Sequence, residues 1–242
     1  MEVSLQNKTI LVTGGTGGLG QAFVDLLSDL GARVLFTFCS QEEKSEQLQT
    51  NGAHAFHLDL SSRDSQQEFI HHITKEYTSL DGIIHNAGVS LDHTLGKFPE
   101  QDFDASMEIN LTSVFLLTKA LYPLLKKSKL AKVVNVTSRN GVRGNFGQAA
   151  YSASKAGLIA LTKSMAEEWG EDGILVNAIT PGYVMSDMTE KLPQSILDKA
   201  KRESYTDSIS DAQEVAKLVA YMMSDHVTKL TGQLWHYDTR KN

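Results

Sequence analysis

Short apolar, β-rich runs alternate with longer amphipathic segments along nearly the whole chain of 242 residues. Between the first two runs, apolar residues recur on one face of a predicted helix and a glycine ends it: Leu19, Phe23, Leu26, Leu27, Leu30 and then Gly31. Helical patterns also span residues 110–125 and 151–170. Strands that alternate with helices in this way are parallel and are joined by right-handed crossovers. The alternation therefore predicts an α/β fold, a doubly wound sheet of about seven strands with helices on both faces. The predicted strands are residues 8–13, 33–38, 54–60, 82–86, 132–138, 175–179 and 233–237.

Composition narrows the class of protein. Lys and Arg number 23 against 29 Asp and Glu, and this net charge of −6 argues against nucleic acid or an anionic membrane as a partner, because phosphates need clustered cations. A single cysteine excludes an internal disulfide. No apolar run approaches the roughly 20 residues that span a bilayer, and the polar start lacks a signal-peptide core. We therefore expect a cytoplasmic protein.

The chain shows no internal repeat, low-complexity stretch or Pro/Gly/Ser-rich linker. One domain over residues 1–242 is the simpler organisation, since α/β folds reach roughly 250 residues as one unit. From about residue 183 to 206, polar residues interrupt the alternation. An insertion of this kind usually lies over the carboxyl ends of the strands, so we expect a substrate lid there.

A glycine-rich turn follows the first predicted strand and opens the first predicted helix, with the sequence Thr13-Gly14-Gly15-Thr16-Gly17-Gly18-Leu19-Gly20. Gly14 allows a tight turn, Gly18 lets the backbone approach a diphosphate, and Gly20 lets the helix pack on the strand. The helix N-terminus offers free N–H groups to phosphates. Because a strand precedes the turn and a helix follows it, the motif predicts a dinucleotide site rather than a flexible loop.

Further motifs follow this turn: Asn86-Ala87-Gly88, Ser138, Tyr151-x-x-x-Lys155 and Pro181-Gly182. Together with the spacing Gly-x-x-x-Gly-x-Gly, they resemble the short-chain dehydrogenase/reductases over residues 5–235. Within that family, residues 145–158 are most similar to 3-oxoacyl-carrier-protein reductases and acetoacetyl-CoA reductases. The resemblance implies a Rossmann fold, an NAD(P)-dependent oxidoreductase acting on CH–OH groups, and a homo-oligomer, either a tetramer or a dimer.

Tyr151 and Lys155 lie four residues apart at the start of a predicted helix, so both project from one face. A phenol with a pKa of about 10 is a poor acid–base group at neutral pH, but a neighbouring ammonium lowers that pKa. Taken alone, such a pair is common in helices. Ser138, at the carboxyl end of a predicted strand, can hydrogen-bond a substrate carbonyl or simply begin a turn. The resemblance implies a catalytic role for Ser138, Tyr151 and Lys155, and adds Asn110, whose backbone carbonyl and a bound water connect Lys155 to solvent.

The choice of coenzyme depends on the end of the second predicted strand. NAD-preferring relatives place an acidic residue there, which binds the adenine ribose and repels a 2′-phosphate. This chain has Phe36-Thr37-Phe38-Cys39-Ser40 at that point and no carboxylate before Glu42. Against this, Gly17 stands where many NADP-dependent relatives carry a basic residue. We favour NADP(H) over NAD(H).

The resemblance implies further contacts with the coenzyme. Asp59 contacts adenine in relatives, although a turn or helix cap before Ser61 explains it nearly as well. The predicted coenzyme-binding residues are Gly14, Thr16, Gly18, Leu19, Gly20, Ser40, Asp59, Leu60, Asn86, Gly88, Tyr151, Lys155, Pro181, Gly182, Val184 and Ser186. Gln148 and Ser138 are the predicted substrate contacts. No grouping of His, Cys and Asp has metal-site spacing, so we predict no metal site.

One dense basic cluster, Lys126-Lys127-Ser128-Lys129 with Lys132 nearby, stands out in an acidic chain. It is explained as a solvated helix end, which favours cations, or as a docking site for an acyl carrier protein or the phosphates of CoA. Glu171-Asp172 stand where many carrier-protein reductases carry a basic residue, which weakens the second explanation. The tail, residues 233–242, lacks the glycine pair of relatives whose tails pack at a subunit interface.

Three functions remain open at this point. The leading hypothesis is NADPH-dependent reduction of a 3-oxoacyl thioester, on a carrier protein or CoA, to the 3-hydroxyacyl thioester. The alternative is a short-chain reductase or dehydrogenase of another carbonyl or secondary alcohol, such as a polyketide intermediate, a sugar or a steroid. A non-catalytic dinucleotide-binding protein is the third, and the presence of all four residues of the catalytic pattern argues against it.

Overall fold

The computed structural model describes residues 2–50, 52–185, 193–238 and 240. Seven strands form one sheet in which all neighbours are parallel, in the order β3-β2-β1-β4-β5-β6-β9. They lie at the positions that the alternation predicts, which confirms the doubly wound α/β fold. The strands are β1 (Thr9–Val12), β2 (Arg33–Phe38), β3 (His54–His57), β4 (Gly82–His85), β5 (Ala131–Val136), β6 (Ile174–Pro181) and β9 (Leu234–Tyr237).

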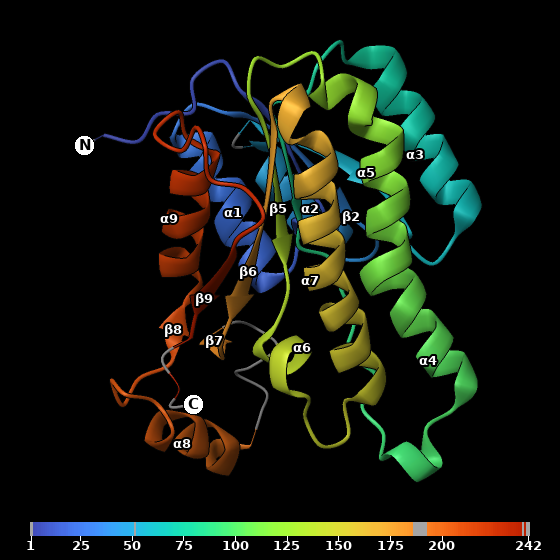
Figure 1. Ribbon diagram of the computed structural model, residues 1–242, viewed down its shortest axis with the longest axis vertical. Coiled ribbons are helices and arrows are strands. Elements are labelled where there is room, and N and C mark those ends of the chain that lie inside the picture. Colours follow the sequence, from blue (N-terminus) through green and yellow to red (C-terminus); the bar gives the residue numbers. More distant parts are fainter. Residues whose placement is uncertain (1, 51, 186–192, 239, 241–242) are drawn as a thin grey trace.

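Helices cover both faces of the sheet (Figure 1). One face carries α1 (Gly18–Asp29), α2 (Glu42–Thr50) and α9 (Ala212–Met223). The other carries α3 (Arg63–Glu76), α4 (Glu100–Met107), α5 (Ser113–Leu125) and α7 (Ala149–Trp169). Beyond the carboxyl ends of the strands lie α6 (Arg139–Arg143), α8 (Gln194–Arg202) and a small parallel sheet of β7 (Val184–Met185) and β8 (Ser210–Asp211).

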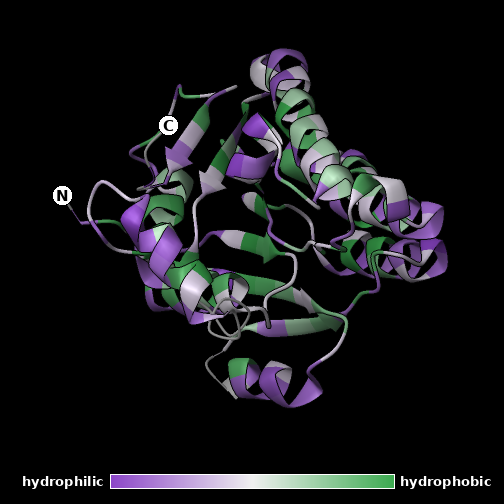
Figure 2. Cartoon of the chain, turned by 90° about the horizontal axis from the view of Figure 1, so that it is seen from below, coloured by the Kyte–Doolittle hydropathy of each residue, from purple (hydrophilic) through white to green (hydrophobic). Residues whose placement is uncertain are grey.

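Alternate residues of each strand pack against opposite helix layers. Ile10 and Val12 of β1 belong to the buried cluster that contains Phe23 of α1, whereas Leu11 belongs to the cluster that contains Leu121 of α5. Successive side chains of a strand point to opposite faces, so a sheet covered on both sides needs continuous apolar runs rather than alternating ones. The strands are accordingly mostly hydrophobic, and hydrophilic residues gather on the outer turns of the helices (Figure 2).

The strand order places a crevice at the carboxyl edge of the sheet. The chain runs from β1 outward to β2 and β3, then returns to β4 on the other side of β1 and continues outward to β5. The loops that follow β1 and β4 therefore run in opposite directions along the sheet. Doubly wound sheets bind their ligands between two such loops, at the carboxyl ends of the strands. β5 ends at Val136, two residues earlier than predicted, because Ser138 is already the N-cap of α6.

Leu121 of α5 tests the packing of the helix layer. Its side chain is fully buried among residues of α3, α5 and the sheet. Leu121→Ala is expected to lower the free energy of unfolding by about 2–5 kcal/mol, because the cavity it leaves collapses only partly. Urea unfolding followed by circular dichroism measures this. Lys119→Ala, exposed on the same helix, is expected to stay within about 0.5 kcal/mol of the unchanged protein. Equal losses in the two variants would contradict the packing.

Candidate active site

The glycine-rich turn forms an open cradle at the start of α1. Gly14 has a φ of +67°, which L side chains rarely adopt. A Cβ on Gly20 would overlap the Gly14 carbonyl oxygen, so the helix approaches the strand only because that side chain is missing. Among the described residues, no side chain caps the first turn of α1. The N–H groups of Gly18, Leu19 and Gly20 therefore lie at a helix N-terminus suited to an anion.

Asn86, directly after β4, braces this cradle. Its Nδ2 donates to the carbonyl oxygens of Thr13 and Gly14, each at 3.1 Å. Its backbone N–H and that of Ala87 donate to the Thr13 hydroxyl at 3.0 and 3.1 Å. The side chain thus ties the end of β4 to the end of β1, and it shapes the cradle through the backbone of the turn.

Ser138 and Tyr151 meet at the carboxyl edge. The Ser138 hydroxyl accepts a hydrogen bond from the Asn140 N–H at 3.2 Å and is hydrogen-bonded to the Tyr151 phenol. Burial raises the pKa of Tyr151; the hydrogen bond to Ser138 offsets only part of this, and the Asp92 carboxylate raises the pKa further. The pKa of Tyr151 therefore lies above its ordinary value, where the sequence predicts a lowered one, because burial has the largest effect. The phenol is protonated at neutral pH.

Lys155 lies one helical turn beyond Tyr151 and is 3% exposed. Its Nζ donates to the Val136 carbonyl oxygen at 2.9 Å and lies 5.8 Å from the centre of the Tyr151 ring. Burial lowers the pKa of Lys155 to about 8. A Cβ on Gly88 would lie 3.3 Å from Nζ, and a Cβ on Gly141 would lie 2.8 Å from the Lys155 backbone. Two glycines thus make room for the ammonium and its helix.

Asn110 is fully buried in a π-helical turn, Glu108–Thr112, that leads into α5. Its Oδ1 accepts from the Val89 N–H at 2.8 Å, and its Nδ2 donates to the Val89 carbonyl at 2.9 Å and to the Ser154 hydroxyl at 3.1 Å. The side chain therefore holds the loop after β4 against α7. Such π turns occur frequently at functional sites.

Gln148, a predicted substrate contact, immediately precedes α7, and its amide is already engaged. Oε1 accepts from the Asn140 and Asn145 amides at 2.6 and 2.9 Å. Nε2 donates to the Ser90 hydroxyl at 3.1 Å and to the Asp92 carboxylate at 2.9 Å. An amide has two donor hydrogens and two acceptor lone pairs, so these partners use its full capacity. Here Gln148 joins the loop after β4 to the loop before α7, and its contact with substrate stays a prediction.

The chain is similar to known proteins over nearly its whole length. A family model described as short chain dehydrogenase matches residues 8–196. The 3-oxoacyl-(acyl-carrier-protein) reductase FabG of Vibrio cholerae is 35% identical over 237 residues, which cover 97% of each chain. That of Aquifex aeolicus is 33% identical over 242 residues, which cover 98% of each chain. The chain belongs to the short-chain dehydrogenase family. The crystal structure of Cj0485 dehydrogenase shares the fold, with a TM-score of 0.91 over 99% of this chain and 95% of that chain at 24% identity.

Short-chain dehydrogenases are oxidoreductases that bind a nicotinamide dinucleotide, and the cradle of this member fits one. The fit is tested by the space around the turn: Gly14 and Gly20 stand where a side chain would strain or overlap the backbone. Thr16, Gly18 and Leu19 complete the turn at the uncapped end of α1. This arrangement suits a diphosphate, which needs close backbone approach and free N–H donors.

The predicted adenine contacts lie at the ends of β2 and β3. Ser40 lines a cavity of about 520 Å³ together with residues 41–44. The sequence offers two explanations of Asp59, an adenine contact and a turn before Ser61, and the turn is present. The Asp59 Oδ1 accepts hydrogen bonds from the Ser61 N–H at 2.8 Å and from the Ser61 hydroxyl at 2.6 Å. These hydrogen bonds lower the pKa of Asp59 and keep the carboxylate charged. Leu60 is buried next to it.

The predicted nicotinamide contacts follow β6. Pro181 is the last residue of that strand, Gly182 donates its N–H to the Tyr237 carbonyl at 2.9 Å, and Val184 begins β7. Ser186 lies outside the described residues, as does the rest of 186–192 in the predicted lid. The described part of the lid consists of β7, residues 193–206 and helix α8 within them.

The geometry contradicts a docking role for the lysine cluster at the active site of the same chain. Lys126 pairs with Asp172 at 2.6 Å, and Lys132 is 3% exposed and donates to the Ser224 carbonyl. Both lie where α5 ends and β5 begins, at the opposite edge of the sheet from Ser138. The predicted strand at residues 132–138 already separates Lys132 from Ser138, because the two residues stand at its opposite ends.

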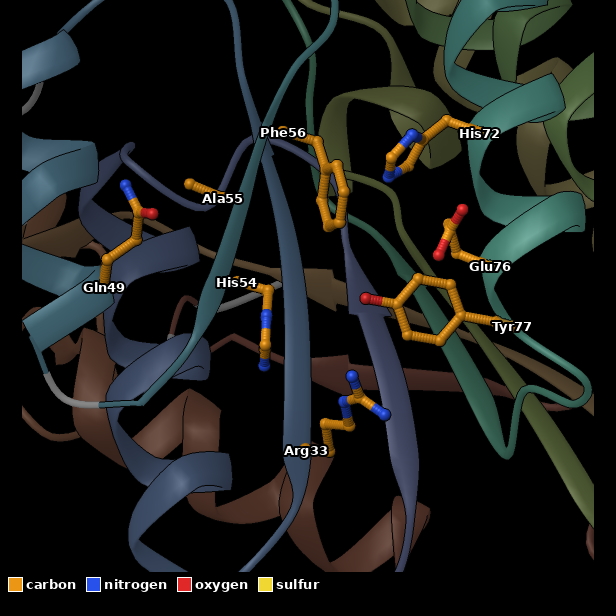
Figure 3. A pocket seen from close by; sticks show the side chains of 8 residues that line it. All are labelled: Arg33, Gln49, His54, Ala55, Phe56, His72, Glu76 and Tyr77. Atoms are coloured by element: carbon orange, nitrogen blue, oxygen red, sulfur yellow. The ribbon is translucent and has the colours of Figure 1, made fainter.

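A cavity of about 280 Å³ lies outside the edge strand β3 (Figure 3). In this cavity, the Arg33 guanidinium carbon lies 5.0 Å from the centre of the Tyr77 ring. His54, the first residue of β3, also lines the cavity. Arg33 and His54 are the first residues of β2 and β3, so this cavity lies at the amino edge of the sheet, away from the crevice.

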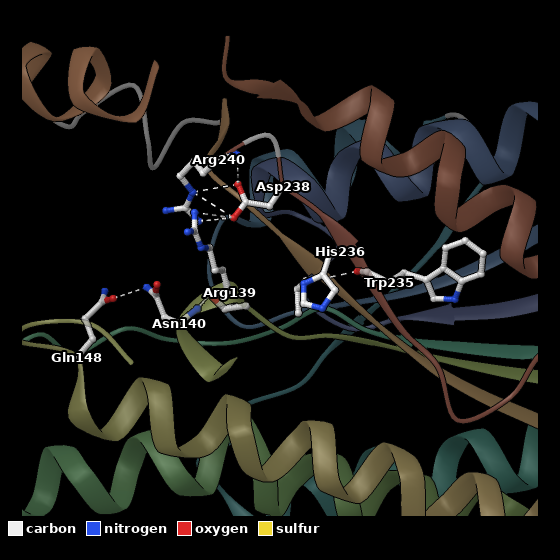
Figure 4. A network of polar contacts seen from close by, with 9 residues as sticks. Arg139, Asn140, Gln148, Trp235, His236, Asp238 and Arg240 are labelled. Carbon is white, nitrogen blue, oxygen red and sulfur yellow. Dashed lines mark hydrogen bonds and ion pairs between the residues drawn. The ribbon is translucent and has the colours of Figure 1, made fainter. Parts of the chain in front are cut away.

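Within the ranges that the structure describes, no helix is long and apolar enough to cross a membrane, and no three His, Cys, Asp or Glu side chains are grouped as a metal site requires. Sequence reasoning missed a different group, Arg139, Asp238 and Arg240, which includes the residue directly after Ser138 (Figure 4). The only available signal was a charged residue directly after the candidate catalytic serine.

Two glycines of the cradle provide a matched test of the dinucleotide site. Gly20→Ala is expected to weaken coenzyme binding about 5- to 150-fold, because its Cβ overlaps the Gly14 carbonyl and the backbone strain costs about 1–3 kcal/mol. Gly17→Ala is expected to bind nearly as well as the unchanged protein, since its Cβ meets only the Gly14 carbonyl oxygen, at 3.5 Å. Isothermal titration calorimetry measures both. Similar affinity in the two variants would contradict the assigned cradle.

Proposed function

We propose that this protein is an NADPH-dependent reductase of 3-oxoacyl thioesters, which it converts to 3-hydroxyacyl thioesters. The observation that carries the proposal is the meeting of Ser138, Tyr151 and Lys155 at the carboxyl edge of the sheet, beside the glycine cradle. The names of the relatives at 33–35% identity support the choice of substrate class. These relatives match over nearly the full length of both chains.

The proposed chemistry assigns one task to each side chain. When bound, NADPH supplies the hydride that adds to the 3-keto carbon. The Ser138 hydroxyl donates a hydrogen bond to the carbonyl oxygen and stabilises its developing negative charge. The Tyr151 phenol, protonated at neutral pH, delivers the proton to that oxygen. The reaction then leaves a phenolate on Tyr151.

Lys155 and Asn110 support this proton transfer. With a pKa of about 8, the Lys155 ammonium is largely charged at neutral pH, and a cation near Tyr151 favours the phenolate that remains after proton donation. Lys155 is also assigned the ribose hydroxyls of the coenzyme in this proposal. Asn110 positions the loop that carries Gly88, and its backbone carbonyl is assigned to the water that links Lys155 to solvent.

The preference for NADPH rests on the end of β2. Ser40 and Lys44 line the cavity there, a hydroxyl donor and a cation that suit a 2′-phosphate. Glu42 and Glu43 line the same cavity, and a carboxylate that faced the ribose would repel the 2′-phosphate of NADPH. The coenzyme preference is therefore decided by which of these side chains faces the ribose. Ser40 is the nearest of these in sequence to the end of β2.

An acyl carrier protein or CoA thioester is the proposed partner, in a cytoplasmic homo-oligomer. The thioester is assigned to the crevice beside Ser138. The lysine cluster lies at the opposite edge of the same chain from Ser138, so a carrier docked on that cluster would lie away from this crevice. Light scattering measures the number of subunits.

The direct test follows the oxidation of NADPH at its absorbance with an acetoacetyl thioester and then with a panel of ketones. Tyr151→Phe is expected to lower kcat about 10²- to 10⁴-fold, because it removes the proton donor, while the affinity for NADPH stays nearly unchanged. Tyr77→Phe, at the amino edge of the sheet, is the matched control and should leave kcat unchanged. Near-native turnover by Tyr151→Phe would contradict the assignment of Tyr151 as the proton donor. A strong preference of the unchanged protein for NADH would contradict the choice of NADPH.

The pH dependence tests Lys155 separately. Burial lowers its pKa to about 8, so the ammonium is lost above that pH and no longer stabilises the phenolate on Tyr151. We expect kcat/KM for reduction to change little below about pH 7 and to fall as the pH rises from about 7 to 10. The Lys126→Gln variant, which changes a surface lysine far from the site, should give the same profile. A kcat/KM that stays constant up to about pH 10 would contradict the role of Lys155.

A further inference from the structure

Asp238, directly after β9, lies at the centre of a buried ionic cluster (Figure 4). Arg139 Nη1 lies 3.3 Å from Asp238 Oδ2. Arg240 approaches the same carboxylate with Nε 2.9 Å from Oδ1 and Nη2 2.9 Å from Oδ2. Each of the three side chains is 9% exposed or less. A guanidinium that binds both oxygens of a carboxylate holds it in a defined orientation, so this is an ordered contact rather than a surface ion pair.

The carboxylate is charged in this environment. Burial raises the pKa of Asp238, but the hydrogen bonds from Arg240 and the charges of Arg240 and Arg139 outweigh burial and lower it. Removing one partner from a buried ionic group leaves a charge without compensation, which destabilises the local arrangement strongly. Neutralising Asp238 would leave two guanidinium groups close together beside the site.

The cluster joins segments that are far apart in the sequence. Arg139 directly follows Ser138 and is 99 residues from Asp238. A Cβ on Gly182 would overlap Asp238 Oδ1, so the carboxylate lies directly against the backbone of the loop after β6. Tyr183 follows Gly182 in that loop, and the centre of its ring lies 4.7 Å from the Arg240 guanidinium carbon.

We propose that Asp238 is a positioning residue for hydride transfer. It holds the Ser138 turn, through Arg139, against the backbone at Gly182, so that the hydroxyl that binds the carbonyl keeps its place relative to the loop that faces the nicotinamide. The inference rests on the proposed function, which assigns carbonyl binding to Ser138, and on the prediction that Gly182 contacts the nicotinamide. A misplacement of about 1 Å in such an arrangement costs about 100-fold in rate.

The test compares the whole coenzyme with a fragment that lacks nicotinamide. Asp238→Asn keeps the shape of the side chain and removes its charge. In this variant we expect NADPH to bind about tenfold more weakly than in the unchanged protein, and 2′-phospho-ADP-ribose to bind within about twofold of it. The two ligands differ because only the nicotinamide end of NADPH is assigned to the Gly182 loop. Isothermal titration calorimetry measures both constants without turnover. We also expect kcat to fall about 10- to 100-fold, with a smaller change in KM for the carbonyl substrate.

Three further variants serve as controls. Asp172→Asn removes another paired carboxylate, at the opposite edge of the sheet, and should change neither binding constant. Asp238→Glu keeps the charge and should recover most of the NADPH affinity. Arg139→Gln combined with Asp238→Asn should lose little more than Asp238→Asn alone, because the two residues act through one contact.

Three outcomes would overturn the proposal. The first is equal weakening of NADPH binding and fragment binding in Asp238→Asn, the second is unchanged NADPH affinity and kcat in that variant, and the third is fully additive losses in the double variant. The proposed function is tested separately, by the oxidation of NADPH by the unchanged protein with an acetoacetyl thioester. Absence of that oxidation would contradict the proposed function. The titrations need no reducible substrate, so they decide the role of Asp238 even if the substrate class is another carbonyl.

Discussion

The buried ammonium of Lys155 is the constraint around which the candidate site is organised. A charged group that is 3% exposed requires compensation, and the Val136 carbonyl oxygen supplies part of it at 2.9 Å. The ammonium reaches this position because Gly141 lets α6 lie close to α7 and Gly88 leaves space above Nζ. Asn110 then fixes the loop that follows β4, so that this space is kept. Removing any of these supports moves the cation relative to Tyr151.

Features encoded over short stretches of sequence could be predicted. The seven strands of the sheet are recognisable from their apolar runs, because a sheet covered on both faces imposes that pattern locally. The glycine-rich turn is recognisable for the same reason: Gly14 and Gly20 meet steric demands within eight residues of chain. The family follows from these motifs and their order, and the comparisons confirm it. The roles of the individual site residues remain predictions.

Features that depend on long-range contacts could not be predicted. The amide of Gln148 is a plausible substrate contact in the sequence, yet its partners Ser90 and Asp92 are 58 and 56 residues away. The partner of Arg139 is 99 residues away. The ends of the strands were misjudged where a polar residue begins the next element, as Ser138 does for α6. The distant partners of Gln148 and Arg139 come close only in the folded sheet, whereas the cap at Ser138 is a local contact with Asn140.

The protonation states of Tyr151 and Lys155 connect this architecture to the direction of the chemistry. The sequence predicts that the ammonium lowers the pKa of the phenol, so that the tyrosine can take part in acid–base chemistry at neutral pH. In the structure, burial raises the pKa of Tyr151 and lowers that of Lys155 to about 8, because desolvation opposes the charged form of each group. A protonated phenol beside a cation is set to give up a proton rather than accept one. The same burial therefore keeps the phenol in the protonated form that the proposed proton transfer to a carbonyl oxygen requires.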